Sequence, residues 1–339
     1  MESQSNQIMS AKYPTKMEVK STTPFYEFKS ALAKTSPDDA HEWLPWALEQ
    51  LPNGWTSNEN RPRGTLHIPA NGLYAKKTVI IPHRCGTQGP TSHVRQMPGL
   101  EAADDFIGEY LLETEETPGQ GVFSNHVRDL SLQCRGKCNG FKVTADQQGL
   151  LFNLWISGWK SIGLNLHKVS RTLIMGLDIE LDEDWKVRRG TGVRAYDSQF
   201  SWLSSTIHNA NIGFDLNECE ALTIDGAAFE KTDQPFRALL CRGLDIRMAH
   251  IRTALELAIE TTNCWSVEFS GVFITCEREM FAIIEGEQKL LTSRGDDTGL
   301  GSLGVYSSAQ EKQNDLIAGL AIEIAALKEE LKRLNSTLT

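Results

Sequence analysis

Apolar and polar residues alternate over short stretches through the middle of the chain, and one such stretch returns, with drift, about every 18 to 29 residues. A clear copy is Ile162-Gly163-Leu164-Asn165-Leu166, and a second short apolar strand precedes each copy. Repetition at this period indicates a solenoid, whose units bury their apolar sides against their neighbours. Two short strands per unit therefore predict a parallel β-helix. The seven copies are 139–143, 162–166, 191–195, 212–216, 237–241, 255–259 and 281–285.

The same alternation predicts which side chains fill the interior, because successive residues of a strand point to opposite faces. The chain has seven cysteines, an odd number, and a polar N-terminus without the apolar core of a secretory signal, so no disulfide framework is expected. Most cysteines are expected to be small buried hydrophobes. The predicted buried ladders contain Leu130, Leu132, Ile156, Leu164, Leu166, Ile179, Val193, Phe214, Leu216, Ile224 and Phe269.

The N-terminal third lacks this regular repeat. Residues 1–35 begin with a polar stretch and are interpreted as an arm that attaches to another protein. A helix start follows at Ser36-Pro37-Asp38-Asp39, with a capping serine and proline at the first helical position. Pro45 is expected to shorten or bend this helix. A helix before a solenoid is expected to cap its open apolar end.

The segment after this helix resembles a known superfamily. A strand ending in Ile68-Pro69, a glycine turn, Tyr74, a second strand at 78–82 and a glycine-rich turn at 86–89 resemble the cap and first coil of pectate-lyase-like proteins. These are right-handed parallel β-helices and include many bacteriophage tailspikes. The resemblance covers about residues 36–286 and implies that fold, but the superfamily includes lyases, hydrolases, isomerases and binding proteins.

Two segments interrupt or follow the repeat. The acidic stretch from Glu101 to Glu116 is interpreted as a long loop or partial coil that leaves the cylinder. Residues 287–312 are interpreted as a linker, in which Gly299 to Gly304 spell a dinucleotide fingerprint without the strand and helix that it requires.

Residues 313–339 carry a coiled-coil seam of three heptads, with apolar residues alternately three and four positions apart. The alternative is one amphipathic helix packed on its own solenoid. The strict spacing is narrower than an ordinary core-facing stripe, and a helix this short needs a partner. The predicted seam consists of Ile317, Leu320, Ile324, Leu327, Leu331, Leu334 and Leu338.

Charge and composition exclude some classes of protein. The net charge of -10 disfavours a nucleic-acid surface, which needs concentrated Lys and Arg. No stretch approaches the roughly 18 apolar residues of a membrane span, so membrane insertion is not expected. No metal or cofactor pattern stands out.

Glycan-cleaving β-helices carry carboxylates on their outer face, and a hydrolase needs two of them roughly 5 to 9.5 Å apart. Adjacent coils lie about 4.8 Å apart, so acids one or two coils apart meet that distance. The opposing interpretation is structural: polar residues must sit outside, and Arg194 beside Asp215 is an ordinary cross-strand pair. The candidate acids are Asp178, Asp215 and Glu218, with Asp245 and Glu268 at a strand position equivalent to that of Asp178.

The catalytic patterns of pectate lyases and polygalacturonases are missing, which disfavours pectin chemistry without excluding every activity. Trp155, predicted to point outward, and Arg194 are candidates for glycan binding, because sugar faces stack on indole rings. A contact between coils or subunits explains an exposed tryptophan equally simply. Trp202, near a strand end, has the same two interpretations.

Together these features predict a right-handed parallel β-helix with a helical cap and a C-terminal coiled coil. They favour a phage tailspike- or fibre-like virion protein, made in the host cytoplasm, that binds a host-surface polysaccharide and joins a tail or capsid protein through its arm. The alternatives are a glycan depolymerase and a bacterial β-helix protein outside any virus. The heptads alone favour two strands, but strand-built flanks supply more contact area than the short coil. The stems of the tailspikes that the chain resembles associate side by side as trimers, and this resemblance implies a homotrimer.

Overall fold

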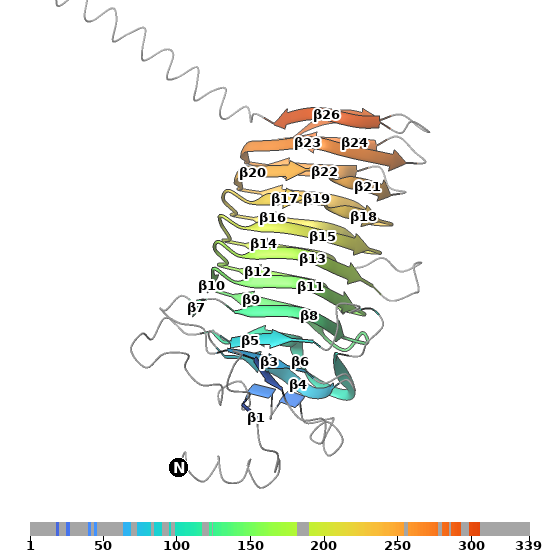
Figure 1. Ribbon diagram of the computed structural model, residues 1–339. Coiled ribbons are helices and arrows are strands. Elements are labelled where there is room, and N and C mark those ends of the chain that lie inside the picture. The colour runs from blue at the N-terminus through green and yellow to red at the C-terminus, as the bar shows by residue number, and fades with distance from the viewer. Residues whose placement is uncertain are drawn as a thin grey trace, which may run out of the picture.

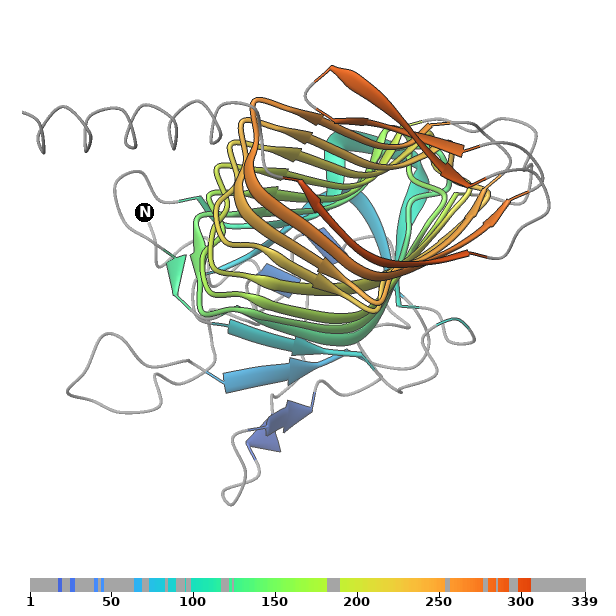
Figure 2. The ribbon, with the colours of Figure 1, turned by 90° about the horizontal axis from the view of Figure 1, so that it is seen from above.

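The computed structural model is an all-β parallel solenoid in which about eight turns, here called coils, stack along one axis (Figure 1). Seen from above, the coils superpose and enclose one interior (Figure 2). The right-handed sense implied by the resemblance stays a prediction. The structure describes residues 18–19, 25–27, 40–41, 44–45, 64–68, 73–82, 85–89, 95, 99–116, 122–123, 125–181, 190–253, 257–276, 280–284, 286–292 and 298–305.

One side of the solenoid, here called face A, is a parallel ladder formed by the recurring glycine-containing phrase. The glycines stand where the coils approach most closely: a Cβ on Gly163 would lie 2.7 Å from the carbonyl oxygen of Gly192 and 2.6 Å from a methyl of Ile179. Glycine recurs in the first four strands of this face because a larger residue does not fit there, whereas Pro235 and Ala258 take the equivalent position in two later coils. The strands of face A are β9 (Asn139–Thr144), β12 (Ile162–His167), β14 (Thr191–Tyr196), β16 (Ile212–Asn217), β19 (Gln234–Leu239), β22 (Leu257–Thr262) and β24 (Met280–Ile284).

The other strand of most coils bends at a residue with positive φ and so forms two faces, whereas the strand Trp202–His208 has no such residue and is one residue shorter at the bend. In β11 (Leu150–Ser157), Asn153 has φ 52°, and the alternation of buried and exposed residues restarts after it. We call the part before the bend face B and the part after it face C. Their other strands are β8 (His126–Gln133), β13 (Leu173–Glu180), β15 (Trp202–His208), β17 (Thr223–Asp225), β18 (Ala228–Glu230), β20 (Arg242–Arg247), β21 (His250–Thr253) and β23 (Trp265–Cys276).

The interior confirms the predicted ladders: all eleven residues named above, from Leu130 to Phe269, are buried. Phe214, Phe229 and Phe236 stack near the C-terminal end, with ring centroids of Phe229 and Phe236 4.8 Å apart. The described cysteines are buried and form no disulfide, as expected: Cys85, Cys134, Cys138, Cys219, Cys241 and Cys264.

The corner between face A and face B contains a buried acid. Asp146 lies in the short strand β10 (Asp146–Gln147), which pairs with β7 (Val122–Phe123). Its Oδ1 accepts a hydrogen bond from the backbone N–H of Asn125 at 3.4 Å, while Oδ2 has no partner in the structure. Burial raises the pKa of Asp146 to about 7. A Cβ on Gly149 would lie 1.7 Å from Oδ2, so only glycine leaves room for this side chain.

The N-terminal coils correct the interpretation of residues 101–116 as a loop. The strand β6 (Leu100–Thr114) runs through this acidic stretch and pairs with β4 and β9. Its apolar ends are buried, and its acidic centre bows outward, so the stretch is part of the wall. The remaining N-terminal strands are β1 (Glu18–Val19), β2 (Phe25–Glu27), β3 (Gly64–His67), β4 (Leu73–Ile81) and β5 (Cys85–Gln88).

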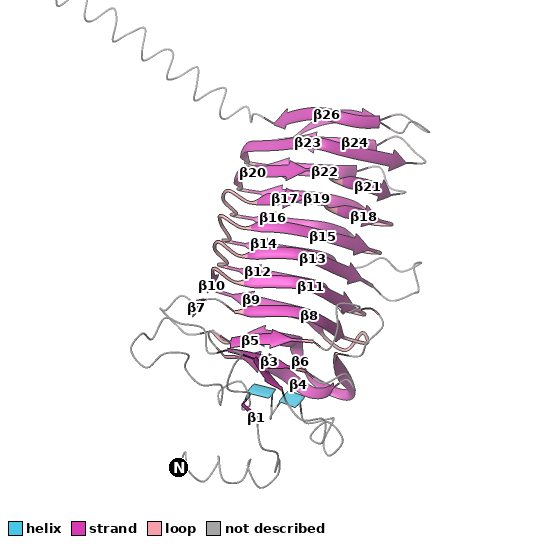
Figure 3. Cartoon of the chain, viewed as in Figure 1, coloured by secondary structure: helices cyan, strands magenta, loops and turns pink. Residues whose placement is uncertain are grey.

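Only short helical pieces are described (Figure 3). Ala40–His41 and Leu44–Pro45 are helical, and Ala40 and Leu44 pack into the core, whereas the rest of the predicted cap helix lies outside the described residues. Most of the arm at 1–35 and all of the coiled-coil seam at 317–338 also lie outside them. Within the described part, no helix is long and apolar enough to cross a membrane.

The C-terminal end corrects part of the predicted linker. The strands β25 (Glu287–Thr292) and β26 (Thr298–Val305) lie within 287–312 and pair antiparallel with β24 and β23 respectively. The glycines of 299–304 therefore lie in a strand. Backbone hydrogen bonds to β23 hold this strand in place, although glycine has no side chain to pack.

Candidate functional site

The structure separates the candidate residues onto different faces. Asp215 of β16 stands on face A between Arg194 of β14 and Arg237 of β19. Arg194 Nε donates to Asp215 Oδ2 at 3.3 Å, and Arg237 Nε donates to Oδ1 at 3.0 Å. Because both oxygens are occupied by guanidinium groups, Asp215 is a structural cross-strand partner, and Arg194 is committed to it.

Glu218 lies three residues beyond Asp215, at a corner position with φ 53°. Its carboxylate hydrogen-bonds Tyr196 and raises the pKa of that phenol. Tyr196 is the partner of Glu218, whereas Arg194 and Arg237 are the partners of Asp215, so the two acids have different partners in the structure.

Asp178 lies on face C in β13, beside Trp155 of β11. Arg95, which precedes β6 by a few residues, reaches across two coils and binds Asp178 Oδ2 with both Nε and Nη2 at 2.5 Å. Asp178 is thereby held in one orientation next to a half-buried indole ring.

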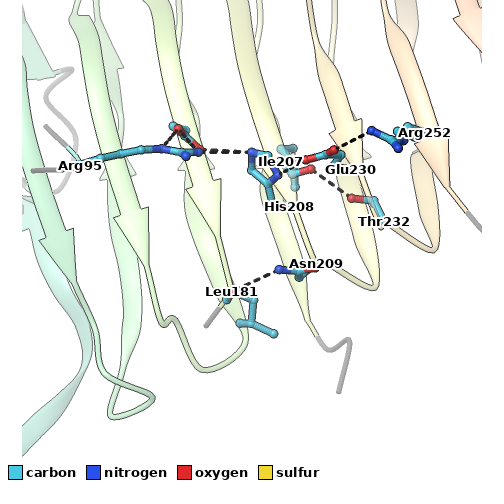
Figure 4. Close-up of polar contacts among 9 residues, drawn as sticks. Arg95, Leu181, Ile207, His208, Asn209, Glu230, Thr232 and Arg252 are labelled. Atoms are coloured by element: carbon cyan, nitrogen blue, oxygen red, sulfur yellow. Dashed lines mark hydrogen bonds and ion pairs between the residues drawn. The ribbon is translucent and has the colours of Figure 1, made fainter. Parts of the chain in front are cut away.

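His208 of β15 extends this cluster toward the next coils (Figure 4). Its Nε2 lies 3.6 Å from Asp178 Oδ1 and 3.4 Å from Arg95 Nη2, and its Nδ1 lies 3.1 Å from Glu230 Oε2. Arginine can only donate, so the contact with Arg95 is a hydrogen bond in the tautomer that carries its proton on Nδ1, and in that tautomer Nδ1 donates to Glu230 Oε2. Arg252 Nη1 completes the row by donating to Glu230 Oε1 at 3.2 Å.

We call Arg95, Asp178, His208, Glu230 and Arg252 the face C row. Asp178, His208, Glu230 and Arg252 come from four successive coils, and Arg95 reaches Asp178 from the segment before β6. Such a row presents fixed guanidinium, carboxylate and imidazole groups along the solenoid axis, a surface suited to bonding a series of hydroxyl groups.

The grouping of Asp178 with Asp245 and Glu268 is wrong. Asp245 and Glu268 stack on face B, where Asp245 is paired with Thr223 in the register, whereas Asp178 stands beyond the bend on face C. The bend at a positive-φ residue splits what the sequence analysis took for one strand. Asp245 also forms an ion pair with Arg247 of its own strand.

Sequence reasoning missed Arg95, His208 and Glu230. His208 and Glu230 end their strands at outward positions, a signal that is present in the sequence but common to many polar residues. In the register, His208 and Glu230 share a column with Glu180 of β13, whereas Asp178 pairs with Thr206, so Asp178 meets His208 diagonally, a contact that the sequence pattern does not indicate. Arg95 stands in an irregular segment, and no periodic pattern indicates its reach. Among the described residues, no group of His, Cys, Asp and Glu is arranged to hold a metal ion.

No protein-family model and no curated protein matches the sequence. Several solved structures align with part of the chain. A protein of Geobacillus virus E2, ORF18, aligns at TM-score 0.44 and 11% identity over 72% of this chain and 60% of its own. The endo-xylogalacturonan hydrolase of Aspergillus tubingensis aligns at TM-score 0.40 and 9% identity over 71% of this chain and 82% of its own. PfbA, a surface adhesin of Streptococcus pneumoniae, aligns at TM-score 0.30 and 8% identity over 79% of this chain and 96% of its own. At these values the residues of this chain must carry any argument about function.

Proposed function

We propose that this chain is a tailspike- or fibre-like structural protein of a phage virion that binds a host-surface polysaccharide along face C. The observation that carries the proposal is the face C row beside Trp155, in which Arg95 and side chains from four successive coils are joined by hydrogen bonds and ion pairs. The sequence features of the arm and of the heptads support attachment to a tail or capsid protein and self-association.

The row favours binding over cleavage. A glycoside hydrolase needs one protonated carboxylic acid as proton donor. Asp178 and Glu230 are each engaged by a guanidinium group, which leaves neither placed to donate a proton. The described acids whose pKa is raised lie elsewhere: burial raises it for Glu113 on face A and for the buried Asp146. A depolymerase remains the second candidate, favoured by the imidazole of His208 between two carboxylates.

The test uses two matched substitutions in the full chain. Asp178→Asn on face C and Asp215→Asn on face A each remove one carboxylate that is paired with arginine on an outward strand position. Binding is measured on an array of bacterial capsules, teichoic acids and lipopolysaccharide O-chains. We expect Asp178→Asn to weaken binding at least tenfold and Asp215→Asn to leave it within about twofold, because only the former removes a ligand-facing group.

Equal losses in the two variants, or no binding by the wild-type chain to any member of the array, would contradict the proposal. A reducing-end assay on the bound polysaccharide separates the two candidates. Sustained release of reducing ends that is abolished by His208→Ala would assign the row to catalysis instead.

A further inference from the structure

Face B carries a cluster of exposed large apolar side chains over three consecutive coils. Leu173 and Met175 of β13 are 39% and 38% exposed, Phe152 of β11 is 41% exposed, and Trp202 of β15 is 40% exposed. Phe200, at the adjoining corner, is 56% exposed. We call these five residues the face B patch.

The patch is continuous because of the strand register. Leu173 pairs with Trp202 of the next coil, and Met175 pairs with Phe152 of the preceding one. Paired side chains on adjacent strands lie about 5 Å apart, so they form one surface. The outward positions of face B in these coils carry no charge, whereas the coils toward the C-terminus carry Asp245 and Glu268 in the same column.

The apolar area of the patch is roughly 400 Å², given that about half of each large side chain is exposed. The largest apolar patch of a typical monomer is about 300 to 600 Å² and is often functional, and a stable interface needs about 800 Å² from each partner. The patch therefore supplies about half of an interface, and a partner must gain the remainder elsewhere.

We propose that the face B patch packs against a second copy of this chain, with Leu173 and Trp202 at the centre of the contact. The predicted heptad seam at 317–338 supplies the remaining association energy and holds the copies parallel, so that equal coils stand at equal height. Copies that each carry a net charge of -10 repel one another. Face A and face C carry rows of charged side chains, so the uncharged patch is the flank on which copies can approach. The contact is independent of the glycan proposal, since it uses the opposite side of the bend.

Two substitutions of the same kind test the contact. Leu173 in the patch and Leu239 on face A are both 39% exposed. We expect Leu173→Lys combined with Trp202→Lys to lower the self-association constant of the full chain at least tenfold, because a lysine would have to be desolvated in the contact. Leu239→Lys should leave it unchanged. Sedimentation velocity over a concentration series measures the mass in multiples of 37.8 kDa, and circular dichroism melts verify folding.

A wild-type chain that is monomeric throughout, or a folded patch variant with wild-type association, would overturn the proposal. A second measurement identifies the occupant. A photo-reactive phenylalanine analogue at position 202 is crosslinked in a mixture of 15N-labelled and unlabelled chains. We expect crosslinks between labelled and unlabelled chains. Crosslinks confined to residues 1–35 of the same chain, or loss of polysaccharide binding without loss of association in the patch variant, would also overturn it.

Discussion

Face B and face C are made by the same strands, on either side of one bend, and they differ in chemistry. Before the bend, β11 and β13 expose Phe152, Leu173 and Met175, and after it their outward residues are the half-buried Trp155 and Asp178. Their inward residues are alike: both halves contribute aliphatic side chains to one core. The comparison teaches that a solenoid fixes its fold through inward positions, and each outward column is then free to become an interface, a binding row or neither.

The largest expected effect tests the hydrophobic core that face B and face C share. Leu164→Asp should destabilise the fold by more than about 4 kcal/mol, because it buries an unpaired charge in the common core. Thermal unfolding followed by circular dichroism measures it. Lys168→Asp is the control, since this exposed position has φ 56°, which aspartate tolerates. A Leu164→Asp protein with the melting temperature of the control would contradict the shared core.

The second prediction concerns the buried acid at the edge of face B. In the folded chain the pKa of Asp146 is raised from 3.8 to about 7. A raised pKa means that the folded state holds the proton more tightly, so the stabilising contribution is present below pH 4 and is lost as pH rises through about 7. The free energy of unfolding, relative to that of Asp146→Asn, should fall by up to about 4 kcal/mol over this range.

Urea unfolding of both proteins at a series of pH values measures this difference. His126 on face B acts in the opposite sense, since burial lowers its pKa and its contribution is lost as pH falls. The comparison with Asp146→Asn cancels the contribution of His126. Parallel curves for the two proteins would show that Asp146 does not titrate in this range.

A third prediction concerns the spacing of the coils, on which both outward surfaces depend. Gly163→Ala should destabilise the fold by about 2 kcal/mol, because its Cβ would approach the carbonyl of Gly192 and a methyl of Ile179. Since Ile179 lies between Asp178 and Glu180 on face C, the strain should reach the face C row. Urea unfolding measures the effect, with Ser161→Ala as an exposed neighbouring control that should change stability by less than about 0.5 kcal/mol.

The smallest expected effect on stability comes from Arg252 on face C. The sharpest test of the comparison measures both polysaccharide binding and self-association for one variant of each face. Arg252→Ala should change the free energy of unfolding by less than about 1 kcal/mol, since its pair with Glu230 is exposed. It should weaken polysaccharide binding and leave self-association intact, whereas Leu173→Lys should do the reverse. If each variant impaired both properties equally, the two faces would not be functionally separate.

The inward residues could be predicted from the sequence, but the bend between face B and face C could not. Alternation around Leu164 or Phe214 requires only a period of two, which is visible without knowledge of neighbouring coils. The bend at Asn153 requires a residue with positive φ, and the residues at such positions range from glycine to Met248. Assigning an outward residue to face B or face C therefore needed the structure, as did the meeting of Arg95 with Asp178. The strand β6 was not predicted because its exposed acidic centre lacks the alternation of apolar and polar residues that identifies the other strands.

The antiparallel strand β26 covers the C-terminal end of the solenoid, where another parallel coil would otherwise add. A parallel ladder ends in a row of unpaired backbone groups that could template another strand, whether from the same chain or from a different one. By pairing antiparallel with β23, β26 occupies that edge with a strand of the wrong polarity for the next coil. End-to-end strand pairing is thereby discouraged at this end, which leaves the flanks of the solenoid as the surfaces for the self-association proposed above.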